Sequence, residues 1–240
     1  NVPVSLNGYG LSDKKDQPFQ WVFPDFQVRP GEYLLVFASG KDRRQAPAYW
    51  NTVISKDDEW RYLVPKSEPA TNWRFNDFND SSWLIGKSGF GFGDDDDATK
   101  IPDASCVYMR KKFNVSTPSD VTQLILHMDY DDGFVAYLNG QEIARSNMID
   151  GGQFPDYSAL ATGQHEAVIY QGMIPEKFMI DNPSALLKVG ENVLAIQGHN
   201  IFSTSTDLSV IPFLSIGTSE PPVNPRNIAL LNLETTQLHT

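Results

Sequence analysis

The stretch FVAYLNGQEIAR, residues 134–145, gives the clearest local signal in this sequence. Its Asn139-Gly140 pair lies between two strand-like runs, and this dipeptide favours a β-hairpin because both turn positions need a positive φ. Outward from the hairpin, further strand-like runs recur along the chain: EWRYLV, CVYMRKKFNV, TQLILHMDY, ENVLAIQGHN and LSVIPFLSIG. Many short runs separated by turn signals predict an all-β sandwich or barrel. DNPSALLKVG, residues 181–190, predicts one short helix.

Composition, charge and cysteine content exclude several classes of protein. The 240 residues suffice for one large β-domain, or for one domain with a small partner. A net charge of −11 argues against nucleic acid and anionic membranes as partners, and no apolar run is long enough for membrane insertion. Cys106 is the only cysteine, which excludes an internal disulfide framework and a zinc site built on paired cysteines. Because the chain begins with Asn1, we expect a mature product or an excised fragment.

An acidic stretch, GFGFGDDDDATK, occupies residues 89–100. Phosphate loops also use spaced glycines, but Asp94, Asp95, Asp96 and Asp97 would repel a phosphate. The calcium loop of an EF-hand needs alternating ligands, then a glycine and a distal glutamate, and this stretch lacks that pattern. A hard cation such as calcium would relieve the repulsion between adjacent carboxylates. The stretch is therefore either a cation site or a solvated acidic turn.

A second acidic group, DYDDG, occupies residues 129–133 between two strand-like runs. Asp131 and Asp132 are typical of a turn whose side chains bond the local backbone. They could instead pair with Arg110 or Arg145, or complete a cation site. A glycosidase would need two such carboxyls facing each other across a cleft.

Other candidate ligand contacts are aromatic or lie at a strand end. Trp60 and Trp83 offer faces on which sugar rings stack, although most aromatics of a sandwich belong to its core. His199 and Asn200 end the run AIQGHN, where they either join a cluster of loops or serve as hydrogen-bonded structural residues.

The N-terminal segment resembles part of a known family. Residues 4–44 carry LNGYGLSD, WVFP and PGEYLLVFASGKDR, and they resemble the second half of a bacterial lamin-tail domain, a small immunoglobulin-like β-sandwich. Relatives continue after a short loop with a strand that begins LHT, and LHT stands here at residues 238–240. The resemblance implies an inserted domain between these two pieces. The incomplete host sandwich would expose strand edges, which favours strand pairing with another chain.

The middle of the chain resembles a second family. Residues 58–217 carry GFGFGDDDDAT, VYMRKKFNV, DYDDGFVAYLNGQEIARSNM, LLKVGENVLAIQGHN and STDLSVIP, and they resemble a galactose-binding-like jelly roll of multidomain bacterial surface proteins. Some such domains hold structural calcium, and many bind glycans through loops at one end. The matched positions are Asp94, Asp95, Asp96, Asp97, Thr99, Arg110, Asp131, Asp132, Asn139, Arg145, His199, Asn200 and Asp207.

These resemblances imply a domain organisation and a function. We expect a partial lamin-tail-like segment over residues 1–45, a linker over 46–57, a jelly roll over 58–217, and a linker with the start of a returning strand over 218–240. The function implied is a non-catalytic binding module of a larger secreted bacterial protein, located outside the cell, at its surface or in the periplasm. Its partners would be a glycan or another cell-surface component, and the other domains of the parent protein.

Specific residues are assigned to each role. We expect calcium at Asp94, Asp95, Asp96, Asp97 and Thr99, and the ligand at Trp60, Trp83, Arg110, Asp131, Asp132, Arg145, His199 and Asn200. A purely structural spacer or protein-interaction module is the alternative, and a hydrolase is a third hypothesis.

Overall fold

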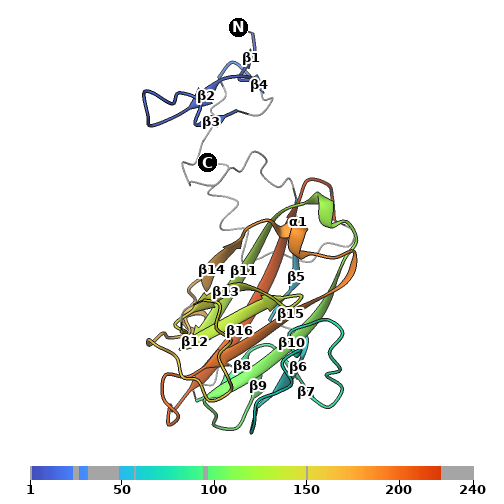
Figure 1. Ribbon diagram of the computed structural model, residues 1–240, viewed down its shortest axis with the longest axis vertical. Helices are drawn as coiled ribbons and strands as arrows, with labels where there is room; N and C mark the ends of the chain where they lie inside the picture. The colour runs from blue at the N-terminus through green and yellow to red at the C-terminus, as the bar shows by residue number, and fades with distance from the viewer. Residues whose placement is uncertain are drawn as a thin grey trace. The chain divides into compact units, whose positions relative to one another are not determined.

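The computed structural model describes residues 2–23, 27–31, 49–56, 58–93, 97–149 and 151–222. The chain divides into two units, Asn1–Ala46 and Pro47–Thr240 (Figure 1). In the described part of the first unit, β1 (Val4–Ser5) pairs with β4 (Gln27–Val28), and β2 (Gly10–Leu11) pairs with β3 (Trp21–Val22). The lamin-tail identity remains a prediction. Residues 32–44 of the matching segment and the C-terminal LHT lie outside the described residues.

The second unit is built on two six-stranded sheets. The first sheet has the strand order β13-β12-β15-β10-β6-β7 and is antiparallel throughout. Its strands are β13 (Gln141–Ser146), β12 (Gly133–Leu138), β15 (Gly190–His199), β10 (Cys106–Val115), β6 (Glu59–Leu63) and β7 (Leu84–Lys87).

The second sheet has the strand order β14-β11-β16-β8-β9, and β5 also pairs with β16. Its strands are β14 (Glu176–Ile180), β11 (Val121–Asp131), β16 (Leu208–Thr218), β8 (Phe90–Phe92), β9 (Thr99–Lys100) and β5 (Tyr49–Ile54). Only the short β8–β9 pair is parallel among these described strands. The described helical segments are single turns: η1 (Pro118–Asp120), η2 (Ile169–Gln171) and α1 (Pro183–Leu186). The all-β sandwich predicted from the sequence is confirmed.

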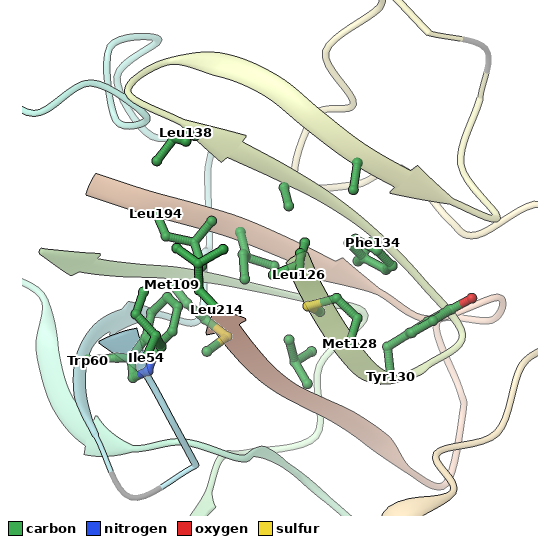
Figure 2. Close-up of a cluster of buried hydrophobic side chains, with 14 of the residues drawn as sticks. Ile54, Trp60, Met109, Leu126, Met128, Tyr130, Phe134, Leu138, Leu194 and Leu214 are labelled. Carbon is green, nitrogen blue, oxygen red and sulfur yellow. The ribbon is translucent and has the colours of Figure 1, made fainter. Parts of the chain in front are cut away.

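The core follows from the alternation of side chains along the strands. On β11, Leu124, Leu126, Met128 and Tyr130 belong to one buried cluster, which side chains from the other sheet complete (Figure 2). The intervening residues of β11 therefore face away from this core. A second buried cluster contains Trp73, Trp83, Tyr108 and Tyr137, among others, and includes side chains from the other face of β10 and β12.

The predicted hairpin is confirmed. β12 and β13 pair antiparallel on either side of the turn, and φ is 53° at Asn139 and 91° at Gly140. The predicted helix is confirmed only as one turn, because α1 ends at Leu186 and Gly190 already begins β15.

Residues 49–54 differ from the expectation of a linker, because they form β5 along β16. The polar residues before this segment hide its strand character, but Thr52 and Ile54 are buried. The acidic stretch also contains structure: Phe90 and Phe92 are buried in β8, which pairs with β16.

Candidate functional site

The candidate site lies where β11 ends and β12 begins. His127, Asp129 and Asp131 alternate with the core residues of β11, so they lie on the face of the strand that points away from the main core. All three are nevertheless buried, with at most 5% of their surface exposed. Buried polar groups need partners, and here a long segment between β13 and β14 supplies many of them.

Asp129 and Asp132, the residue that follows β11, bind the backbone of this segment. The Asp129 side chain accepts hydrogen bonds from the amides of Val168 (2.7 Å) and Ile169 (2.9 Å). The Asp132 side chain accepts from the amides of His165 (3.1 Å) and Ile201 (2.8 Å). These two aspartates therefore fix the loops that approach the end of the sandwich.

Other side chains from the first sheet bind the same segment, again through its backbone. Arg145 donates to the carbonyl oxygens of Ile149 (2.6 Å) and Gln153 (2.7 Å). Gln197 donates to the carbonyl oxygen of Pro155 (3.2 Å). The segment between β13 and β14 thus takes its path from side chains that belong to the strands.

The Asp131 carboxylate lies close to two other carboxylates. One carboxylate oxygen from each of Asp131, Glu166 and Asp207 lies within 4.8 Å of the others. Asp131 is buried, Asp207 is half-buried and Glu166 is exposed, so the group is open to solvent on one side. Burial, together with the charges of Asp132 and Asp207, raises the pKa of the Asp131 carboxyl to about 8. Once ionised, three converging carboxylates are the kind of oxygen donors that hold a hard divalent cation.

The candidates from the sequence lie in different places. Trp60 lies in the main core and Trp83 in the second cluster, and both are less than 10% exposed. Arg110 forms a buried ion pair with Asp80 and donates to the carbonyl oxygen of Phe75 (2.8 Å). Burial lowers the pKa of Arg110 to about 10. These three side chains are occupied inside the protein.

His199 and Asn200 lie near the acidic end of the site but are buried. His199 Nδ1 is 2.9 Å from the carbonyl oxygen of Ala159, and its Nε2 is 3.8 Å from Cys106 Sγ. Burial lowers the pKa of His199 to about 4, so the ring is neutral at physiological pH. Asn200 donates to the carbonyl oxygen of Ala104 (3.1 Å). Both match the structural alternative considered from the sequence.

Of the residues proposed to hold calcium, the structure describes only Asp97 and Thr99. Asp94, Asp95 and Asp96 fall outside the described residues. Thr99 donates to the carbonyl oxygen of Lys87 (2.6 Å), and Asp97 lies over Gly91 of β8. Among the described residues, the three-carboxylate group that could hold a metal includes neither of them.

The structure brings together Asp131 and Asp207, which the family resemblance had matched, with Glu166, which sequence reasoning did not propose. Glu166 lies in the segment HEAVI, residues 165–169, and no local pattern marks it as a ligand. Its position depends on the hydrogen bonds that the backbone amides of His165 and Val168 donate to Asp132 and Asp129.

Among the described residues, no helix has the length and apolar character needed to span a membrane. No protein-family model matches this sequence, and no curated protein matches it.

Several solved structures are similar to part of the chain. A β-glucuronidase of Bacteroides uniformis shares 17% identity at a TM-score of 0.45, over 70% of this chain and 18% of that one. The D341A D367A variant of β-glucuronidase 2 of the same organism, described as a calcium binding mutant, shares 15% identity at a TM-score of 0.43. The match covers 70% of this chain and 18% of that one. A β-glucuronidase of an uncultured Clostridium species shares 15% identity at a TM-score of 0.42, over 78% of this chain and 31% of that one. The chain thus spans less than a third of these enzymes, and at such TM-scores the likeness assigns it no activity.

Proposed function

We propose that this chain is a calcium-binding, non-catalytic β-sandwich module that binds carbohydrate within a larger secreted bacterial protein. The observation that carries the calcium assignment is the cluster of Asp131, Glu166 and Asp207, whose carboxylate oxygens lie within 4.8 Å of one another. The carbohydrate ligand and the secreted setting rest on the resemblance of residues 58–217 to galactose-binding-like modules.

Calcium suits this cluster for electrostatic reasons. The raised pKa of Asp131 reflects the cost of placing a buried negative charge beside other carboxylates. A divalent cation removes that cost by pairing with the ionised oxygens. Ca²⁺ takes six to eight oxygen ligands in flexible geometry, so water completes a site of three carboxylates that is open on one side.

The non-catalytic assignment is supported by how the polar side chains are used. Arg110, His199 and Asn200 contact backbone or carboxylate partners in the interior. Two surface cavities, one along β13 and one beside Trp83, include none of the three clustered carboxylates. A glycosidase would instead place two carboxyls across a substrate cleft.

The calcium part is tested by thermal unfolding of the full chain after treatment with EDTA, followed by addition of CaCl₂ or MgCl₂. A cation at about 100 times its Kd stabilises by about 2.7 kcal/mol. For a unit of this size the midpoint should rise by about 5 °C or more in calcium. Asp131→Asn and Asp207→Asn should lose the rise, whereas Asp103→Asn, an exposed acid outside the cluster, should keep it. An equal rise in all variants would refute the assignment of these ligands.

The carbohydrate part is tested by native gel electrophoresis of the calcium-loaded chain through gels that contain soluble polysaccharides. Retardation by at least one polysaccharide, reversed by its free oligosaccharide, is the expected result. Unchanged mobility in every gel would contradict carbohydrate binding and favour a structural spacer.

A further inference from the structure

A surface groove lies along β13 beside the Asn139-Gly140 turn, and none of the three clustered carboxylates lines it. Its volume is about 730 Å³, and Phe75, Gln141, Glu142, Ile143 and Phe154 are among the residues that line it. This volume falls within the range of small-molecule sites, roughly 300–1,000 Å³.

Two aromatic rings line the groove and stay exposed. Phe75 is 41% exposed and Phe154 is 56% exposed. Phe75 lies directly on the hairpin turn, since a Cβ built on Gly140 would come within 2.3 Å of its ring. An exposed aromatic ring that is already packed on one side offers its other surface to a ligand at little cost in side-chain entropy.

The second ring is fixed in place as well. The guanidinium of Arg74 lies 3.7 Å from the centroid of the Phe154 ring, and the ring of Tyr137 lies 6.0 Å away. A cation–π contact at this distance is favourable, and here it orders a side chain that projects from a loop. The groove therefore has two preordered aromatic walls.

Polar side chains that also line the groove supply hydrogen bonds. Gln141 is exposed and offers both an amide donor and an acceptor. Glu142 accepts from Nε (2.9 Å) and Nη2 (2.7 Å) of Arg145, which neutralises its charge and fixes its orientation. A carboxylate has about four lone-pair positions, so Glu142 retains acceptors for hydroxyl groups.

We propose that this groove binds a neutral saccharide, with a sugar ring stacked on Phe154 or Phe75 and its hydroxyl groups bonded to Gln141 and Glu142. This inference rests on the proposed carbohydrate function and adds its location and ligand class. The paired charges of Glu142 and Arg145 and the net charge of −11 favour a neutral ligand over an anionic one. Apolar ring faces and polar edges match the two kinds of surface in the groove.

The test uses the full chain in calcium, in gels that contain neutral polysaccharides (β-glucan, xylan, galactomannan, dextran) or acidic ones (polygalacturonate, heparin). Isothermal titration with a tetrasaccharide of the retarding polysaccharide then gives the Kd. Phe154→Ala and Gln141→Ala should each weaken binding, the former about tenfold. Phe202→Ala is the matched control, because Phe202 is 55% exposed and does not line the groove. Unchanged melting temperatures establish that the variants are folded.

The outcomes separate the groove from the wider proposal. Binding of a neutral polysaccharide that is lost in the two groove variants and kept in Phe202→Ala supports the groove. Binding that survives Phe154→Ala and Gln141→Ala overturns the location while the proposed function stands. Retardation only by acidic polysaccharides overturns the ligand class, and retardation by none overturns the carbohydrate function itself.

Discussion

Gly91 shows how a single residue determines the packing of the acidic stretch. A Cβ at this position would lie 1.8 Å from the carbonyl oxygen of Leu208 and 2.5 Å from an Asp97 carboxylate oxygen. No side chain fits between β8 and β16 here, so the glycine is needed for close approach rather than for a ligand.

Gly91→Ala should therefore destabilise the protein by about 2 kcal/mol or more, because the backbone of β16 cannot yield without breaking its pairing with β8. Urea unfolding monitored by circular dichroism measures this loss. Gly151→Ala is the control, since a Cβ at Gly151 meets no atom within 4 Å. Equal stability of the two variants would show that β8 does not pack as described.

His199 makes stability depend on pH. Its pKa is lowered to about 4 by burial, whereas an unfolded histidine titrates near 6.5. As the pH falls below about 6.5, the unfolded chain binds a proton that the folded chain does not, so stability falls. The stability that neutral His199 contributes is complete above about pH 6.5 and is lost as the pH falls toward about 4. The free energy of unfolding falls by up to about 1.4 kcal/mol per pH unit in this range.

Unfolding free energies at several values between pH 7.5 and pH 4.5 measure this slope. His199→Gln should be less stable at neutral pH but should show a shallower decline as the pH falls. Parallel curves for the wild type and the variant would assign the acid sensitivity to other groups.

At the level of elements, the hairpin depends on Asn139 in two ways. Its φ of 53° is a conformation that most side chains disfavour. Its side chain also donates to Leu186 (2.9 Å) and Asn192 (2.7 Å) and accepts from the amide of Val193 (3.0 Å). The turn is thus tied to α1 and to the neighbouring strand β15.

Asn139→Ala should cost about 2–4 kcal/mol, of which the backbone conformation contributes about 1–2 and the lost hydrogen bonds the remainder. Asn182→Ala separates these terms, because Asn182 has a φ of 52° but makes no side-chain capping bond. We expect the Asn182 variant to lose only the conformational part. If chemical denaturation gives equal losses for both, the hydrogen bonds of Asn139 contribute nothing net.

The sequence predicts elements whose signals are local and misses features that depend on distant contacts. The hairpin is predictable because Asn139-Gly140 encodes its own turn, whereas β5 is hidden by polar neighbours and forms only because β16 lies beside it. The candidate site divides in the same way. Asp131 and Asp207 are marked by motifs, but Glu166 is placed by hydrogen bonds that its neighbours donate to carboxylates more than 30 residues away.

For the whole molecule, the division into two units predicts independent stability of the sandwich. A chain trimmed to residues 47–222 should unfold cooperatively, with a midpoint within about 2 °C of the main transition of the full chain, because both sheets and both buried clusters lie inside it. Differential scanning calorimetry of the two chains makes the comparison. A large drop on trimming would mean that the first unit contributes to the fold of the second.

The bonds that hold the segment between β13 and β14 have a consequence for how such a protein evolves. Asp129, Asp132, Arg145 and Gln197 bind this segment through its amides and carbonyls. Every residue except proline carries both groups, so substitutions within the segment leave most of these bonds intact. The path of the segment therefore depends on residues outside it, in the strands or directly beside them. Apart from Phe154 and Glu166, to which the proposals assign a role, side chains of the segment can therefore change over generations while its path is preserved.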